Sequence, residues 1–125
     1  MCGITGFIDF KRNTLMQELQ KMTDVLHHRG PDGSGYKLIE KGDYTLGFGH
    51  RRLSIIDLTE SGAQPMNFQE FWISFNGEVY NFDEIKSELE LLGHKFKSTS
   101  DTEVVLQAYA RWGSACVDKF IGMFA

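Results

Sequence analysis

The residue best suited to act as a nucleophile stands at the start of the chain, where Cys2 directly follows Met1. A small second residue usually permits removal of the initiator methionine, which would leave Cys2 with a free α-amine. α-Amines have pKa values of about 7.7 to 8.0 and thiols of about 8.5. The amine can therefore act as general base for the thiol of the same residue. Cys2 is a candidate nucleophile for attack on an amide, although a cysteine at this position is by itself an unspecific signal.

A second candidate group is the neighbouring pair Asn76 and Gly77. Attack on an amide carbonyl creates an oxyanion, which fixed hydrogen-bond donors in a dry pocket stabilise. An asparagine side chain offers an NH2 donor, and a glycine lets the backbone approach the substrate closely. The alternative interpretation is that this Asn-Gly pair is a favoured hairpin turn, which leads into a short strand over 78–80.

The composition indicates one globular domain or a part of one. Hydrophobic residues make up 42% and aromatic residues 13% of the 125 residues, too apolar a mixture for a disordered chain. The formal net charge of -4 leaves no basic excess to attract nucleic acid or an anionic membrane. No apolar run approaches the roughly 20 residues of a membrane span, and no signal peptide is visible. We therefore expect a cytoplasmic protein.

The remaining candidate ligands and nucleophiles point to structural roles. Cys116 stands between Ala115 and Val117 and is interpreted as a small core residue, and a disulfide to Cys2 is not expected in a reducing cytosol. No recognised zinc spacing connects the histidines, so no metal site is expected. The histidines are His27, His28, His50 and His94.

Hydrophobic spacing predicts the elements of the first half of the chain. Apolar residues at helical spacing predict a helix over 14–27, which Gly30 and Pro31 would end. A loop around Pro65 is expected over 59–67. Expected strands over the whole chain are 2–9, 44–49, 53–57, 71–75 and 78–80.

Two further helices are expected in the second half. The first has an apolar face at positions 85, 89 and 92 and would be closed by Gly93. The second begins at the capping-box pattern Ser100-x-x-Glu103 and ends at Gly113. Residues 121–125 look like the opening of a strand without a turn or a partner. We interpret the chain as a fragment of a longer polypeptide.

Six segments in this order resemble the class II glutamine amidotransferases, which have the N-terminal-nucleophile hydrolase fold. The combination is closest to the asparagine synthetase branch and spans the chain from residue 2 to residue 125. Any one of the motifs is unspecific, whereas all of them together are typical of this family. The segments are Cys2-Gly3-Ile4-Thr5-Gly6, His28-Arg29-Gly30-Pro31-Asp32, Arg52-Leu53-Ser54-Ile55-Ile56-Asp57, Gln64-Pro65, Asn76-Gly77-Glu78-Val79-Tyr80-Asn81 and Ser100-Asp101-Thr102-Glu103.

The resemblance assigns chemistry to the matched residues. Cys2 would be the catalytic nucleophile, and the Asn76 side chain with the Gly77 N–H would form the oxyanion hole. Arg52 would bind the α-carboxylate of glutamine, since a guanidinium grips a carboxylate with two parallel bonds. The matched partners of the α-ammonium group and the backbone lining of the pocket would be Glu78, Asp101, Leu53, Ser54, Ile55 and Ile56.

Several neighbours of these residues are interpreted as structural. Arg51 would point away from Arg52 on a strand and is expected to be a solvated surface charge. Asp101 also lies in a capping region, where a carboxylate favours a helix N-terminus. Arg29 and Asp32 are expected to hold the turn beside the site. The glycine-rich stretch 30–35 lacks the lysine of a phosphate-binding loop, and His50 is expected to pack in or near a strand.

The fold implied by the resemblance is α+β, a four-layer αββα sandwich of two antiparallel sheets that is incomplete in this chain. Residues 1–125 would be a glutaminase domain truncated at its C-terminal end, with the synthetase domain missing. The implied activity is hydrolysis of glutamine to glutamate and ammonia. In the full-length enzyme the ammonia would serve ATP-dependent conversion of aspartate to asparagine. The truncated chain itself is expected to be a poor enzyme.

The implied partners are glutamine and the synthetase domain of the same chain, with no nucleic acid and no membrane. The glutaminase domain needs no cofactor, whereas ATP and Mg²⁺ are expected in the missing domain. An exposed sheet edge would invite pairing with a second copy. Two alternatives stay open: an amidotransferase domain that serves a sugar or another carboxylate, and a non-catalytic module that binds glutamine or a partner.

Overall fold

A computed structural model describes residues 2–53 and 62–125. Within these residues the fold is α+β, and every strand pairs antiparallel with its neighbour. No helix in the described ranges is long and apolar enough to cross a membrane. In chain order the elements are β1 (Gly3–Asp9), α1 (Met16–Asp24), η1 (His27–Arg29), β2 (Gly33–Glu40), β3 (Thr45–Arg52), β4 (Met66–Phe68), β5 (Phe71–Ile73), β6 (Gly77–Val79), α2 (Phe82–Leu91), α3 (Asp101–Trp112), η3 (Gly113–Lys119) and β7 (Gly122–Phe124).

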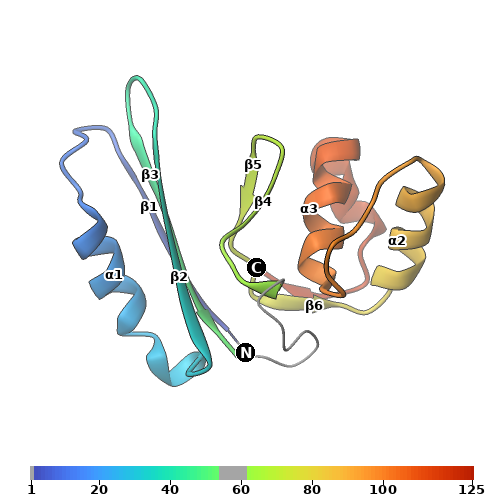
Figure 1. Cartoon of the computed structure of the whole chain (residues 1–125), viewed down its shortest axis with the longest axis horizontal. Helices are drawn as coiled ribbons and strands as arrows, with labels where there is room; N and C mark the ends of the chain where they lie inside the picture. Colours follow the sequence, from blue (N-terminus) through green and yellow to red (C-terminus); the bar gives the residue numbers. More distant parts are fainter. Residues whose placement is uncertain (1, 54–61) are drawn as a thin grey trace.

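The largest sheet has the strand order β1-β3-β2, with β3 in the centre. Side chains alternate between its two faces, and the helix α1 covers one of them (Figure 1). Close approach of α1 depends on Gly49, because a Cβ atom there would collide with the hydroxyl groups of Thr23 and Thr5. These two hydroxyls lie 2.8 Å apart and form a hydrogen bond between α1 and β1. Gly49 on β3 therefore permits the close distance between helix and sheet.

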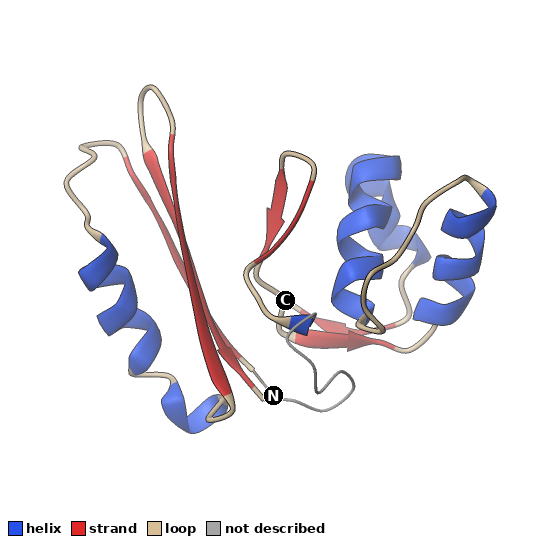
Figure 2. Cartoon of the chain, viewed as in Figure 1, coloured by secondary structure: helices blue, strands red, loops and turns tan. Residues whose placement is uncertain are grey.

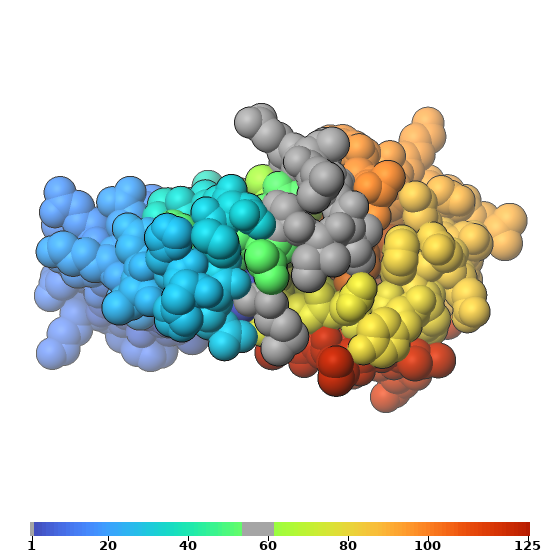
Figure 3. Space-filling model, turned by 90° about the horizontal axis from the view of Figure 1, so that it is seen from below, coloured from blue at the N-terminus to red at the C-terminus, as the bar shows by residue number. Residues whose placement is uncertain are grey.

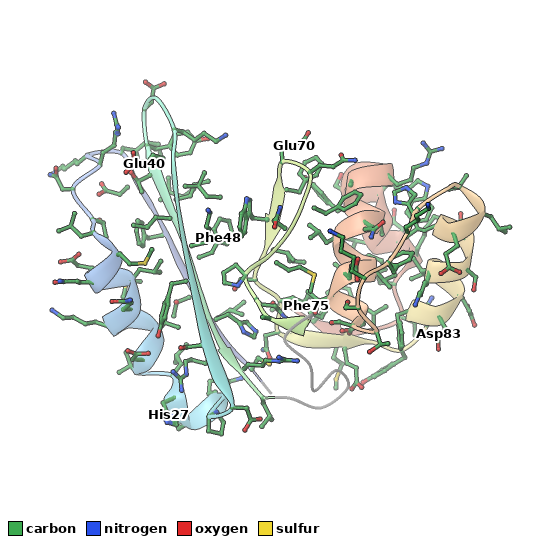
Figure 4. The ribbon with its side chains drawn as sticks, viewed as in Figure 1. His27, Glu40, Phe48, Glu70, Phe75 and Asp83 are labelled. Atoms are coloured by element: carbon green, nitrogen blue, oxygen red, sulfur yellow. The ribbon has the colours of Figure 1, made fainter. Side chains whose placement is uncertain are left out.

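The opposite face of this sheet looks toward the β4–β5 hairpin. Figure 4 shows Phe48 projecting from β3 toward this hairpin. The Lys37 ammonium group lies 4.5 Å from the centre of the Trp72 ring, and the Ser74 hydroxyl donates to the Gly49 carbonyl oxygen at 3.1 Å. An open, mostly apolar groove of about 500 Å³ runs along β1 and β3 beside Ser74. The inner face therefore contacts β5 and the residue that follows it.

The hydrophobic core lies in the second half of the chain. Here α2 and α3 pack together above the two-stranded sheet of β6 and β7 (Figure 2). In the space-filling view the segment coloured blue to cyan occupies one end of the molecule and the yellow and orange segments the other (Figure 3). The buried core residues are Phe75, Val79, Ile85, Leu89, Val104, Val105, Ala108 and Cys116.

Both expected helices of the second half are present, and α3 begins as predicted. The Ser100 hydroxyl accepts from the Thr102 N–H at 3.2 Å. The second half of the capping box is wrong, because the Glu103 carboxylate does not reach back to Ser100. It accepts instead from the Lys97 and Ser98 N–H groups at 2.7 to 3.1 Å. Glu103 therefore orders the loop before α3, while Gly93, with a φ of 92°, ends α2.

Several predicted boundaries in the first half are wrong. The helix expected over 14–27 ends at Asp24, because the chain then tightens: the Leu26 N–H donates to the Thr23 carbonyl oxygen and η1 follows. The strand β2 was not predicted, because its glycines and polar residues leave no clear alternation of apolar and polar side chains. Within the loop predicted over 59–67, Met66 and Asn67 begin β4. In the second half, the strand expected over 121–125 without a partner is β7, which pairs with β6.

Candidate active site

The turn after α1 holds the N-terminus against the end of β3. The Arg29 Nε atom donates to the Cys2 carbonyl oxygen at 3.1 Å, and the Asp32 N–H donates to the Arg52 carbonyl oxygen at 3.0 Å. A side chain at Gly30 would collide with the backbone of Arg51 and Arg52. The turn thus positions two of the candidate site residues, in agreement with the structural role expected for Arg29 and Asp32.

The Cys2 thiol is free, half-buried and in contact with the residue that follows β3. Its Sγ atom lies 3.4 Å from the Leu53 backbone nitrogen, which donates to it, and 3.7 Å from the Leu53 carbonyl oxygen. The sulfur is therefore fixed at the end of the sheet where the Arg29 turn also lies. The other backbone candidates, Ser54, Ile55 and Ile56, are outside the described residues.

The pair Asn76 and Gly77 is not a hairpin turn. Gly77 begins β6 and lies opposite Phe124, while the Asn76 N–H and carbonyl groups both bond to Ala125 at 2.9 Å. A Cβ atom at Gly77 would collide with the backbone of β7, so the strands approach more closely than a larger residue permits. The Asn76 Oδ1 atom is buried and has no hydrogen-bond partner within the described residues. The amide oxygen therefore caps no local structure among the described residues.

A hydrogen-bonded bridge connects the three-stranded sheet to the residue before Asn76. The His50 Nε2 atom donates to the Phe75 carbonyl oxygen at 3.2 Å. The Phe75 N–H donates to the Gln64 Oε1 atom at 2.6 Å, and the Gln64 Nε2 atom donates to the Thr102 hydroxyl at 3.2 Å. In Figure 4 Phe75 lies between the sheet and the helices. Both polar groups of the Phe75 backbone are thus held by side chains from distant parts of the chain.

His50 is uncharged in this environment. Burial lowers the pKa of His50 to about 4, and the nearby positive charge of Arg52 acts in the same direction. Because the Phe75 carbonyl oxygen can only accept, the proton of the neutral ring is on Nε2. The Nδ1 atom is then an acceptor, and it has no partner among the described residues. The expectation that His50 packs in a strand is confirmed.

The two arginines at the end of β3 point to opposite sides, as expected, but the prediction of a solvated Arg51 is wrong. Arg51 is 9% exposed, donates from Nε to the Gly30 carbonyl oxygen at 3.1 Å and pairs with the Asp24 carboxylate at 3.4 Å. It joins the turn to α1 on the helix side of the sheet. Arg52 is half-buried on the other face, close enough to His50 to affect its pKa.

The two acidic candidates differ in burial. Asp101 is buried, and its Oδ2 atom accepts from the Val79 N–H at 3.0 Å, which ties the start of α3 to β6. Burial raises the pKa of Asp101, and the negative charge of Glu78 adds to that shift. Glu78 itself is exposed. Asp101 therefore has a structural bond in addition to any contact with a ligand.

The structure brings the candidates into two groups. Cys2, Leu53 and Arg52 lie where β1 begins and β3 ends. The other group surrounds β6 and consists of Asn76, Gly77, Glu78 and Asp101. The bonds from His50 to Phe75 and from Ser74 to Gly49 are described links between β3 and the segment before Asn76. No contact between the Cys2 and Asn76 side chains is described. No three His, Cys, Asp or Glu residues of the described ranges cluster as a metal site.

Sequence reasoning did not find the bridging role of His50 and Gln64. His50 was expected only to pack, and Gln64 was recognised only as part of a motif. Their partners are backbone atoms 25 and 11 residues away, so no spacing rule could reveal the contacts. The one available signal was that a glutamine beside Pro65 recurs in the family resemblance.

Comparison with known proteins identifies the family. The profile of the glutamine amidotransferase domain matches residues 1–125, and the chain belongs to this family. Asparagine synthetase [glutamine-hydrolyzing] 3 and asparagine synthetase [glutamine-hydrolyzing] 1 of Bacillus subtilis are 44% and 42% identical to it. Amidase chry2 of Gibberella zeae is 34% identical. Each comparison covers the whole chain, which spans 20% of the length of each of these three relatives.

Proposed function

We propose that this chain hydrolyses glutamine to glutamate and ammonia, with the thiol of Cys2 as nucleophile after removal of Met1. The observation that carries this proposal is the match of the glutamine amidotransferase domain to residues 1–125. The free, half-buried thiol of Cys2 next to Leu53 supports it.

In the proposed reaction the Cys2 sulfur attacks the side-chain amide carbon of glutamine, and its proton passes to the α-amine of the same residue. The Asn76 NH2 group and the Gly77 N–H stabilise the oxyanion. The bond from carbon to nitrogen then breaks, and ammonia leaves with the proton returned by the amine. Water attacks the resulting thioester, which releases glutamate and regenerates the thiol. No cofactor is required for any of these steps.

Substrate recognition follows from charge. Arg52 binds the α-carboxylate of glutamine, and Asp101 with Glu78 binds the α-ammonium group. The segment that contains Leu53, Ser54, Ile55 and Ile56 contributes backbone groups to the pocket. The half-burial of Arg52 and the position of Asp101 beside β6 support this arrangement.

For the whole protein we propose that the ammonia serves an ATP-dependent conversion of aspartate to asparagine in a synthetase domain of the same chain. The support is the 44% and 42% identity to two asparagine synthetases that are about five times longer. Residues 1–125 would then be the N-terminal part of a glutaminase domain with a four-layer αββα sandwich. The proposed location is the cytoplasm, and the exposed strand edges allow a second copy to pair.

A second acceptor remains a candidate because a 34% identical relative is named an amidase. Relatives of this chain therefore include a protein that is not named an asparagine synthetase. Sequence encoded beyond residue 125 distinguishes the two: an ATP-pyrophosphatase motif supports asparagine synthesis, whereas a sugar-isomerase domain contradicts it.

The glutaminase proposal is tested by mass spectrometry of a single turnover. Met1-free protein is mixed with glutamine, quenched in acid and digested, and the peptide that begins at Cys2 is examined for a γ-glutamyl thioester. Detection of one adduct needs no rapid turnover, so the test suits a slow enzyme. The adduct and stoichiometric ammonia are expected in the wild type and not in Cys2→Ala. Ammonia release that persists in Cys2→Ala would contradict the proposal.

A further inference from the structure

The described residues contain a buried histidine that takes no part in the steps of the proposed reaction. His50 is 1% exposed, lies in the central strand β3 and makes one described hydrogen bond, to the Phe75 carbonyl oxygen. That carbonyl belongs to the peptide group that joins Phe75 to Asn76. His50 therefore acts on the backbone directly before the proposed oxyanion donor.

The Phe75 backbone is held from two opposite sides. Its carbonyl oxygen accepts from His50, and its N–H donates to Gln64 at 2.6 Å. The next residue is fixed as well, because the Asn76 N–H and carbonyl groups bond to Ala125. Two consecutive residues thus have all four backbone polar groups occupied, which leaves little freedom to the Cα atom that carries the Asn76 side chain.

The Asn76 side chain itself has no such support within the described residues. Its Oδ1 atom is buried without a hydrogen-bond partner, so no described side chain orients the amide. A buried polar atom without a partner is rare and calls for a functional explanation. Among the described residues, the backbone is what constrains the orientation of the NH2 group, and a shift of about 1 Å in a catalytic group can cost about 100-fold in rate.

We propose that His50 is a positioning residue for the oxyanion hole: its Nε2–H bond to the Phe75 carbonyl oxygen sets the peptide plane that aims the Asn76 amide. This proposal rests on the proposed glutaminase function. The bond requires a neutral ring with its proton on Nε2, since a carbonyl oxygen can only accept. His50 acts through the backbone and does not touch the substrate.

The test compares two replacements of His50 in the Met1-free chain. His50→Leu removes the donor and keeps the site apolar, whereas His50→Gln keeps an N–H donor at a reach close to that of Nε2. In His50→Leu the kcat for ammonia release should fall about 10- to 100-fold while the KM for glutamine changes less than about threefold. In His50→Gln most of the kcat should return. If His50 had a purely structural role, both variants would lose kcat, and the loss would follow their loss of stability.

Thr23→Val is the matched control, because Thr23 is also fully buried and bonds across the other face of the same sheet, to Thr5. It should lower stability as much as His50→Leu and leave kcat unchanged. An equal loss of kcat in Thr23→Val and His50→Leu would overturn the proposal. Should His50→Leu not fold, His50→Asn replaces it, because the shorter amide does not reach the Phe75 carbonyl oxygen.

A second readout does not need activity. The side-chain NH2 resonances of Asn76 in a ¹H–¹⁵N spectrum should shift in His50→Leu, remain near the wild-type position in His50→Gln and be unaffected in Thr23→Val. Unchanged Asn76 resonances in His50→Leu would overturn the proposal whatever the kinetics. If the wild type releases no ammonia, the glutaminase function fails, and the Asn76 resonances still decide whether His50 positions this side chain.

Discussion

The Asp101 Oδ2 atom accepts a hydrogen bond from the Val79 N–H across 3.0 Å, so the first turn of α3 holds the strand that begins at Gly77. Glu103, two residues later in the same turn, accepts from three donor groups that fix the preceding loop: the N–H groups of Lys97 and Ser98 and the Ser98 hydroxyl. The carboxylate proposed to bind the glutamine ammonium group is therefore placed by the fold before any ligand arrives.

Asp101→Asn separates the structural bond from the charge. An asparagine oxygen still accepts from Val79, and burial raises the pKa of Asp101, so its charge is costly in the folded state. We expect unchanged or slightly higher stability at pH 7 and a KM for glutamine about 10- to 100-fold higher, the loss of one charge-assisted bond. Thermal unfolding and ammonia-release kinetics measure both. An unchanged KM would show that Asp101 serves only to hold β6.

The free energy of unfolding should decrease as the pH falls, because His50 is buried in its neutral form. The ordinary pKa of histidine is 6.5, and burial lowers the pKa of His50 to about 4. Between these values the unfolded chain binds a proton that the folded chain does not, so stability present at pH 7 is lost as pH falls. The expected loss is about 3 kcal/mol at most. Asp101, whose pKa is raised, contributes with the opposite sign near its own pKa.

The measurement is urea denaturation of the wild type and His50→Gln at several values between pH 7 and pH 4. All other titrating groups are shared, so the difference between the two curves isolates His50. His50→Gln should lose less stability on acidification. Parallel curves for the two proteins would contradict a neutral, buried histidine.

The close contact of β6 with β7 predicts a large effect of Gly77→Ala. The added Cβ atom would collide with the Met123 carbonyl oxygen and with Phe124, which are backbone neighbours that cannot move alone. We expect a loss of about 1 to 3 kcal/mol in the free energy of unfolding and loss of ammonia release. Gly42→Ala is the control, because its Cβ atom would meet nothing within 4 Å. Equal stability of the two variants would show that β7 is not docked on β6.

Particular residues show what the sequence could and could not predict. Gly93 and Ser100 have strong local preferences, so the end of α2 and the start of α3 follow from sequence. The strand β2 begins with glycines that have no apolar pattern of their own, and its pairing with β3 decides its structure. Local rules likewise favoured a hairpin turn at Asn76 and Gly77, whereas pairing with β7 keeps this segment extended.

The site shows the same division between local and distant causes. The candidates at Cys2, Arg52, Asn76 and Asp101 came from residue chemistry and family resemblance. The ion pair of buried Arg51 with exposed Asp24 and the bridge from His50 to Phe75 connect residues about 25 positions apart. Such contacts depend on how the sheet stacks on its neighbours, which spacing along the chain does not encode.

The most direct measurement compares ammonia release from glutamine by Met1-free protein and by protein that retains Met1, with N-terminal mass spectrometry of both samples. The α-amine of Cys2 is the proposed general base, and an added methionine turns it into an amide that cannot accept a proton. The account predicts ammonia release from the Met1-free chain only, and none when Cys2 is replaced by alanine. Equal rates with and without Met1 would contradict it.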